Sequence, residues 1–247
     1  MATIQKLSTL LFALIFIAIL SNASATVFTL QNSCSYTIWP GTLSGNGAAP
    51  LGDGGFQLAP GATIQLPAPP GWSGRFWART GCNFDASGNG NCMTGDCGGN
   101  IKCIGGGAPP VSLVEFTIGG GGEAMDFYDV SLVDGYNVAL GVRPSGGAGD
   151  CQYAGCVADL NGNCPDELKV VDGGGAVVAC RSACAAFNTP EFCCTGDFAT
   201  PNTCTPTRYS ELFKNACPTA YSYAYDDLTS TCTCAGSDYV ITFCPTN

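Results

Sequence analysis

Cysteine is the residue type that most restricts the folds open to this chain. Seventeen cysteines lie between Cys34 and Cys244, in a sequence of 247 residues that contains no histidine. An odd number leaves at least one thiol unpaired. The spacing of Cys92, Cys97 and Cys103 is compatible with a metal site, but without histidine local disulfides are the favoured interpretation. We therefore expect a disulfide framework, no metal site and no other cofactor.

Residues 1–25 have the pattern of a secretory signal peptide. Lys6 supplies a positive charge, and residues 10–20 form an apolar run that is too short to span a bilayer comfortably. Ala23-Ser24-Ala25 then supplies small residues for cleavage. The mature chain is expected to begin at Thr26 and to be secreted, which is the setting in which dense cysteines are oxidised.

The charge balance and the missing histidine exclude several functions. The chain has 9 basic and 19 acidic residues, a formal net charge of −10. Nucleic acid and anionic membranes are poor partners for such a surface, and no stable membrane insertion is expected. Without histidine, Ser-His-Asp and Cys-His catalysis are impossible, so any acid–base chemistry must be carried out by carboxylates.

The pattern of short β-rich runs separated by glycine and proline predicts an all-β domain. Strands are expected at 26–30, 36–40, 63–66, 75–80, 111–118, 127–142 and 239–243, with a hairpin turn at Asp134-Gly135. The segment 151–217 has many cysteines and the helical patterns, which indicates a second, disulfide-stapled unit. Its main helix is expected to include Tyr209 to Ala216, with Thr205 as N-cap and Pro206 at the first helical position, and a shorter helix is expected at 181–187.

The segment from Leu113 to Asn137 carries the candidate chemistry. It contains five carboxylates with no Lys or Arg to offset them: Glu115, Glu123, Asp126, Asp129 and Asp134. Carboxylates beside aromatic rings can bind a sugar chain, and a protonated and an ionised carboxyl together can hydrolyse it. The alternative is a solvated acidic edge. Asp129 and Asp134 are five residues apart, so both can face one cleft only if Asp134 leaves the regular strand.

Six segments of the sequence carry a family resemblance: GRFWARTGC, GNGNCMTGDCGGNIKC, DFYDVSLVDGYN, CPDELKV, EFCCTG and AYSYAYDDLTSTCTC. They closely resemble the thaumatin-like proteins, the pathogenesis-related group 5 defence proteins of plants, over the whole mature chain. The resemblance implies a two-sheet β-sandwich core as domain I, with residues 26–79, 116–157 and 218–247. It also implies a disulfide-rich helical and loop domain II (158–217), a small disulfide-stapled loop domain III (80–115) and an acidic cleft between domains I and II.

The resemblance also implies a pairing of sixteen cysteines. The pairs are Cys34–Cys244, Cys82–Cys92, Cys97–Cys103, Cys151–Cys234, Cys156–Cys217, Cys164–Cys180, Cys184–Cys193 and Cys194–Cys204. Cys232 remains, at a position where the family usually carries an apolar residue. We expect Cys232 to be a small buried thiol, because free cysteine behaves as a buried hydrophobe. The alternative is an exposed thiol that links two molecules.

Antifungal members of the family carry one arginine, one glutamate and three aspartates at the cleft. By motif these correspond to Arg75, Glu115, Asp129, Asp134 and Asp226, with Arg79 and Asp227 as the alternatives. Our hypothesis makes Glu115 the general acid and Asp134 or Asp129 the base or nucleophile. Four tyrosines are candidate sugar platforms: Tyr128, Tyr136, Tyr223 and Tyr225. Glu123 and Asp126 are expected to be solvated linker charges.

The function implied by the resemblance is that of a secreted, antifungal defence protein in the plant apoplast. It would bind the β-1,3-glucan of fungal walls as a monomer and would have weak endo-β-1,3-glucanase activity. The alternative is a glucan-binding or hydrolase-inhibiting protein that acts without turnover. Allergen behaviour is implied by the family alone.

Overall fold

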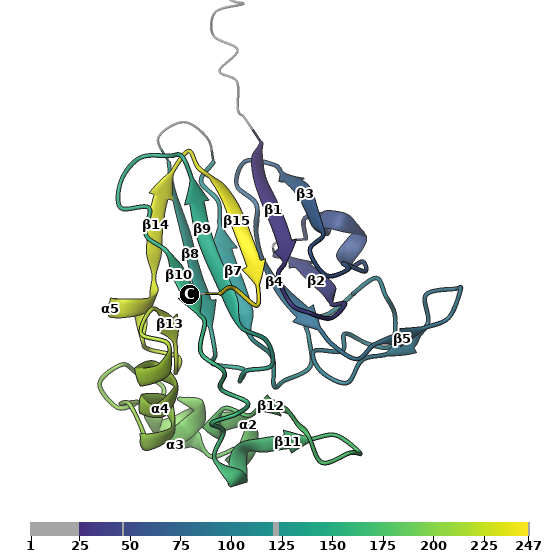
Figure 1. Cartoon of the computed structure of the whole chain (residues 1–247). Coiled ribbons are helices and arrows are strands. Elements are labelled where there is room, and N and C mark those ends of the chain that lie inside the picture. The colour runs from purple at the N-terminus through teal and green to yellow at the C-terminus, as the bar shows by residue number, and fades with distance from the viewer. Residues whose placement is uncertain (1–24, 46, 121–123, 247) are drawn as a thin grey trace, which may run out of the picture.

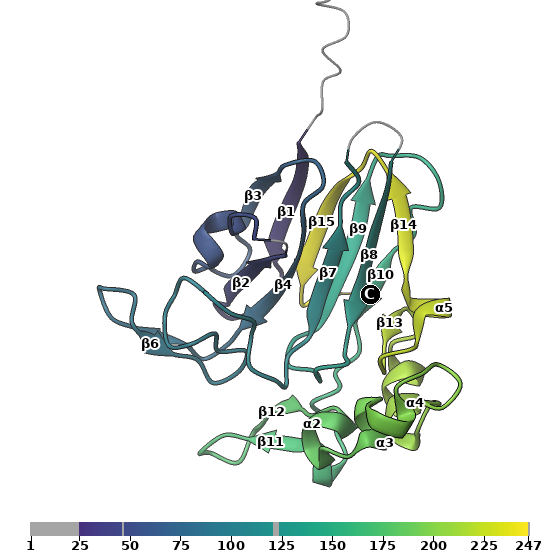
Figure 2. The same ribbon diagram turned by 180° about the vertical axis from the view of Figure 1, so that it is seen from behind.

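Two β-sheets face each other in the computed structural model, which describes residues 25–45, 47–120 and 124–246 (Figures 1 and 2). Within these residues no helix is long and apolar enough to cross a membrane. The expected signal peptide, apart from Ala25, lies outside the described residues, and so does Glu123. The all-β fold expected from the sequence is confirmed.

The first sheet has five strands in the order β10-β9-β15-β1-β3. Their bounds are Ala154–Cys156, Leu140–Ser145, Asp238–Phe243, Thr26–Asn32 and Thr63–Ala68. The second sheet has the order β13-β8-β7-β4-β2, with β14 paired to β8. The bounds here are Ala220–Tyr221, Met125–Ser131, Leu113–Thr117, Ser73–Arg79, Trp39–Ser44 and, for β14, Cys232–Ala235. Strands β1 and β15 run parallel, so the two ends of the fold lie side by side (Figure 1).

Aromatic side chains fill the space between the sheets. Phe28 on β1 lies 4.7 Å from Phe116 on β7, ring centre to ring centre, and 5.0 Å from Phe76 on β4. Tyr239 on β15 contacts Phe116 at 4.9 Å and Tyr128 on β8 at 5.1 Å. All five side chains are buried, and each contributes roughly 1.5–3 kcal/mol through burial. Because side chains alternate between the two faces of a strand, the residues next to these core aromatics face outward.

The turn at Asp134-Gly135 forms, but the predicted hairpin is wrong. Strand β8 ends at Ser131 in the six-stranded sheet, whereas β9 begins at Leu140 in the five-stranded sheet. The chain therefore crosses from one sheet to the other at this turn. Gly135 has φ of +97°, and a Cβ there would lie 2.8 Å from the Cys180 carbonyl oxygen, so glycine suits both the turn and the close packing.

A unit of irregular structure, residues 80–110, covers part of the outer face of the six-stranded sheet; we call it the loop unit. It contains two short strands, β5 (Asn83–Phe84) and β6 (Gly90–Asn91), and extends to the side of the sandwich (Figures 1 and 2). Its cysteines Cys97 and Cys103 pack with Trp77, Val111 and Leu113 in a second, smaller core. The loop unit is thus held together by disulfides and one tryptophan, without a large apolar core of its own.

Residues 158–217, the helical unit, lie at one end of the sandwich (Figure 1). Its elements are η2 (Asp166–Leu168), β11 (Lys169–Val171), β12 (Val177–Cys180), α2 (Ala183–Phe187), α3 (Pro190–Cys193), η3 (Gly196–Phe198) and α4 (Arg208–Ala216). The expected N-cap of α4 at Thr205 is wrong. Thr207 is the cap because its hydroxyl accepts from the Ser210 N–H, and Ser210 Oγ accepts from the Thr207 N–H. The expected short helix at 181–187 corresponds to α2, capped by Ser182.

The eight disulfides of the structure join the pairs that the resemblance implied. Cys232 is the free cysteine among the described residues, and it is buried on β14 with 9% of its surface exposed. The buried-thiol expectation is therefore met, and the exposed alternative is not. Two shorter segments complete the fold: η1 (Leu51–Gly54) and α5 (Asp227–Ser230). The strand expected at 36–40 begins instead at Trp39.

Candidate functional site

Three charged side chains lie in register on the outer face of the six-stranded sheet. Arg75 on β4 is opposite Glu115 on β7, and Glu115 is opposite Asp129 on β8. Opposite residues of antiparallel strands have Cβ atoms about 5 Å apart on the same face. We call Arg75, Glu115 and Asp129 the acidic row. It lines a hollow of about 260 Å³, together with residues that include Thr117 and Phe127.

Strand alternation explains the composition of the row. On β8 the side chains of Tyr128 and Val130 point into the core, so Phe127 and Asp129 point outward. Phe127 is 49% exposed and offers a ring face beside the carboxylates. An aromatic face next to hydrogen-bond acceptors is suited to a sugar ring, which has apolar C–H faces and a rim of hydroxyls.

Charge is distributed unevenly along the row. Arg75 Nη1 lies 4.0 Å from Glu115 Oε1. Burial raises the pKa of Glu115, the Arg75 guanidinium opposes that rise, and Asp134 adds to it. Among the described residues no cation forms an ion pair with Asp129, and burial, Glu115 and Asp227 together raise its pKa to about 8. Asp129 Oδ1 is also buried without a hydrogen-bond partner. At neutral pH, Asp129 is therefore the protonated member of the pair.

Asp134 and Asp227 approach the row from outside the strands. Asp134 lies in the turn that follows β8, so it leaves the regular strand as the cleft hypothesis required. Its charge acts on Glu115, whereas the charge of Asp227, at the start of α5, acts on Asp129. The Tyr221 hydroxyl donates a hydrogen bond to Asp227 Oδ1 at 2.9 Å. Tyr221 thus holds Asp227 in place, although the sequence analysis did not select it.

Asp226 has a structural role, in contrast to the expectation that it would bind substrate. Its Oδ2 atom lies 3.0 Å from Lys214 Nζ on α4. The same oxygen accepts hydrogen bonds from the N–H and hydroxyl of Ser222, at 2.9 and 2.8 Å. Asp226 therefore ties the segment before α5 to the helical unit, and Asp227 is the aspartate that faces the row.

Arg75 rather than Arg79 belongs to the row. Arg79 is completely buried, and its guanidinium donates to backbone carbonyls at Trp39, Asn100 and Ile101 over 2.7–2.9 Å. Burial lowers the pKa of Arg79 to about 10, and Asp96 opposes that change. Arg79 remains charged at neutral pH and anchors the loop unit to the sheet.

The predicted tyrosine platforms fall into two groups. Tyr128 and Tyr136 are buried, and their hydroxyls donate to the carbonyls of Gln152 and Ala158. They cannot stack on a sugar, so these two predictions are wrong. Tyr223 and Tyr225 are partly exposed, and the Tyr225 hydroxyl donates to the Ala199 carbonyl.

Asp126 also differs from its expected role as a solvated charge. It is buried and accepts hydrogen bonds from the Tyr239 hydroxyl at 2.7 Å and the Gly119 N–H at 2.8 Å. It therefore closes the core at the start of β8, and its side chain faces away from the row.

Comparison with known proteins identifies the scaffold that carries the row. The model of the thaumatin family matches residues 32–245. The chain belongs to the thaumatin family. It is 67% identical over 232 residues to the pathogenesis-related protein 5 of Arabidopsis thaliana, a match that covers 94% of this chain and 95% of that protein. This degree of identity places it among the group 5 pathogenesis-related, thaumatin-like proteins.

Other relatives of this thaumatin-like chain carry different names. A Prunus avium protein named glucan endo-1,3-beta-glucosidase is 54% identical over 226 residues, covering 90% of this chain and 92% of that protein. Among solved structures, a β-1,3-glucanase domain from Clostridium beijerinckii has a similar fold, with a TM-score of 0.56, 11% identity, and coverage of 90% and 99%. A thaumatin-like xylanase inhibitor matches with a TM-score of 0.50 and 24% identity, covering 88% and 99%. The two structural matches concern the fold alone.

Proposed function

We propose that this thaumatin-like protein is a secreted, antifungal plant defence protein that binds β-1,3-glucan along the acidic row and hydrolyses it slowly. The observation that carries the proposal is the register that sets Glu115, beside Arg75, opposite Asp129 on the adjacent strand. Burial raises the pKa of Asp129 to about 8, so the two carboxyls have different tendencies to ionise. Glycoside hydrolysis requires such a pair. The name of the Prunus avium relative and the pathogenesis-related name of the Arabidopsis relative support the substrate and the setting.

The electrostatics support the reverse of the acid and base roles that were expected from the sequence. Asp129 retains its proton up to about pH 8 and is the general acid that protonates the leaving glycosidic oxygen. Glu115 lies next to the Arg75 cation and is the ionised partner, either as the nucleophile or as the base that takes a proton from the attacking water. Phe127 supplies the ring on which a glucose residue stacks.

The test uses Asp129→Asn and Glu115→Gln, with Asp197→Asn as a matched control on the exposed surface. Release of reducing sugar from soluble β-1,3-glucan should fall by about 10²–10⁴-fold in the first two variants, because each loses a proton-transfer group. The control should keep its full rate. If both row variants also keep full activity, the acidic row does not perform the hydrolysis.

A second function, glucan binding without turnover, is favoured by the shape of the row. Its hollow of about 260 Å³ lies on an open sheet face and is smaller than the 300–1,000 Å³ typical of ligand pockets. A site of this kind encloses little of the substrate and excludes water poorly. Sedimentation with insoluble β-1,3-glucan separates the two functions: retention on the glucan that depends on Glu115 and Phe127, without sugar release, selects the binding protein.

A further inference from the structure

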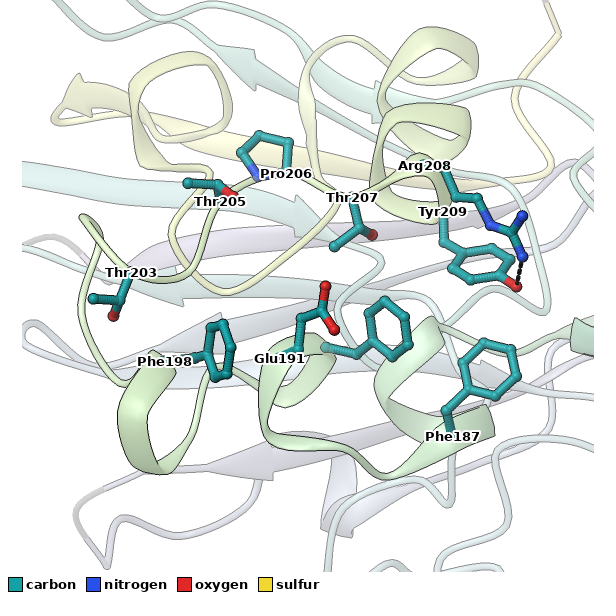
Figure 3. A pocket seen from close by; sticks show the side chains of 10 residues that line it. Phe187, Glu191, Phe198, Thr203, Thr205, Pro206, Thr207, Arg208 and Tyr209 are labelled. Carbon is teal, nitrogen blue, oxygen red and sulfur yellow. Dashed lines mark hydrogen bonds between the residues drawn. The ribbon is translucent and has the colours of Figure 1, made fainter.

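The helical unit contains a larger pocket that the acidic row does not share. It has a volume of about 520 Å³ and is lined by residues of α2, α3, η3 and the start of α4. Figure 3 shows Glu191 between Phe198 on one side and Phe187 and Tyr209 on the other. We call this the aromatic pocket. Its size and its aromatic lining are those of a small-molecule or sugar site.

Disulfides hold the walls of the aromatic pocket rigid. Cys184–Cys193 joins α2 to α3, and Cys194–Cys204 joins the end of α3 to the segment before α4. The rings of Phe187, Phe192 and Tyr209 contact one another at 5.2–5.7 Å between centres. A pocket whose walls are fixed in this way requires little ordering when a ligand binds.

The polar groups of the pocket indicate the charge of the ligand. Arg208 Nη2 donates to the Tyr209 hydroxyl at 2.6 Å and lies 3.7 Å from Glu167 Oε1, so this cation already has an anionic partner within the protein. Within the described part of the chain, the Glu191 carboxylate forms no ion pair and no hydrogen bond. The pocket therefore presents a carboxylate that accepts hydrogen bonds, while its one lining cation, Arg208, is already paired with Glu167, which disfavours an anionic ligand.

The remaining lining favours hydroxyls over a simple cation. Thr203 and Thr205 stand at the pocket with Glu191, so donors and acceptors are both present beside the ring faces. A neutral sugar matches this combination because its ring has apolar faces and its hydroxyls both donate and accept. A bare ammonium group would satisfy Glu191 but would leave the Thr205 hydroxyl unused, whereas the Thr203 hydroxyl already bonds to Thr200.

A second, smaller hollow adjoins the aromatic pocket. A narrow crevice shares Glu191, Phe192 and Tyr209 with the aromatic pocket and extends to Val133 and Tyr223. Val133 directly precedes Asp134, whose charge acts on Glu115. The crevice shares no lining residue with the hollow around the acidic row, so the two are separate sites.

We propose that the aromatic pocket is a second saccharide-binding site, which takes a neutral β-linked glucan through ring stacking on Phe198 and Phe187 and through hydroxyl contacts with Glu191. The identity of the sugar rests on the proposed function. The position of the site rests on the pocket alone. A polymer that occupies both sites would be retained longer than one held at the row, since the second contact forms within one complex.

The experiment is a titration of the ¹⁵N-labelled protein with β-1,3-linked glucohexaose, followed by amide shifts. The wild type should show two sets of shifts, one around 183–209 and one around 113–131. Glu191→Gln should weaken the first set at least about tenfold and Phe198→Ala should abolish it, while both leave the second set unchanged. Glu115→Gln should weaken the second set alone. Glu211→Gln, an exposed substitution on α4 outside the pocket, is the matched control and should change neither.

The other possible results of the titration distinguish the second site from the acidic row. Shifts confined to 113–131 overturn the second site and leave the proposed function intact. Shifts confined to 183–209 overturn glucan binding at the row and support the second site. If the cationic glucosamine hexamer binds the pocket and the neutral glucohexaose does not, the pocket is a cation site and the proposal fails. Glu191→Gln is expected to fold normally, because its side chain is exposed and makes no contact that the substitution removes.

Discussion

Two arginines on one strand occupy opposite environments. Arg75 and Arg79 are four residues apart on β4 and project from the same face. Arg75 stands on the open part of the sheet, about two-fifths exposed, with Glu115 Oε1 at 4.0 Å. Arg79 lies beneath the loop unit, completely buried, with its guanidinium bonded to backbone carbonyls. Residue type and strand position alone therefore do not reveal the role of either side chain.

The difference lies in what covers the sheet. At the Arg79 end the loop unit has little apolar surface of its own. Two internal disulfides hold it together, and the buried Arg79 cation on β4 bonds it to the sandwich. At the Arg75 end nothing among the described residues covers the strands as closely, and the carboxyls there remain in contact with solvent. Buried charge anchors the loop unit at one end, and half-exposed charge forms the acidic row, the proposed glucan site, at the other.

The largest effect is expected from Arg79→Met. This variant would leave the carbonyls of Trp39, Asn100 and Ile101 buried without donors, and each unsatisfied group costs about 1–3 kcal/mol. We expect the free energy of unfolding to fall by roughly 3 kcal/mol or more. Denaturant unfolding at constant pH measures this loss. Arg79→Lys, which keeps the charge but has fewer donors, should fall between Arg79→Met and the wild type; equal stability of all three would show that Arg79 is not the anchor.

The next largest effect is expected for Asp129, as a change in how the free energy of unfolding depends on pH. Its pKa in the folded protein is about 8, above the value of about 4 in an unfolded chain. As pH rises between these values, the unfolded chain loses a proton that the folded protein retains, so stability falls. Asp129→Asn should remove most of that decline and should be more stable than the wild type at pH 8 by at least about 1 kcal/mol.

Thermal unfolding between pH 4 and pH 9 checks this prediction, with Asp197→Asn as the control that keeps the wild-type slope. If the pH profile of Asp129→Asn has the wild-type slope, Asp129 is not the protonated group. Hydrolysis of glucan should follow the same ionisation. Because Asp129 is the proposed acid, the rate should decline as pH rises through about 8.

Much of this fold could be predicted from the sequence, because its determinants are local or carried by the motifs. The all-β fold was predicted from short β-rich runs separated by glycine and proline. The pairing of the cysteines was implied by the family resemblance. The row itself was also predicted from motifs, in that Arg75, Glu115 and Asp129 were selected before their register was known. The predicted hairpin failed because turn residues do not specify whether the next strand joins the same sheet.

The errors at the site have two physical causes. Tyr128 was chosen for its proximity in sequence to Asp129, but neighbours on a strand face opposite sides, so it enters the core. The same alternation could have identified Phe127, which shares the face of Asp129. Asp226 and Asp227 could not have been distinguished in this way. Their roles depend on Lys214 and Tyr221, which only the tertiary fold brings to them.

A smaller effect is expected from Phe127→Ala, which tests whether the open end of the sheet binds sugar. The ring is half exposed, so its removal should change the free energy of unfolding by less than about 1 kcal/mol. Retention on insoluble β-1,3-glucan should nevertheless fall several-fold if the ring is a platform. Met125→Ala is the matched control, because Met125 is also exposed on β8 and lies outside the hollow around the row. Equal retention of both variants would remove Phe127 from the site.

The smallest change in stability is expected from Arg75→Ala, the counterpart of the Arg79 variant. A half-exposed pair at 4.0 Å contributes less than about 1 kcal/mol, so unfolding should be nearly unaffected. The pKa of Glu115 should rise, however, because the guanidinium is the cation that opposes its protonation. Carboxyl shifts of the ¹³C-labelled protein, followed against pH, measure this change directly. An unaltered Glu115 titration would mean that Arg75 does not set the charge of the row. The two arginines would then differ only in how deeply they are buried.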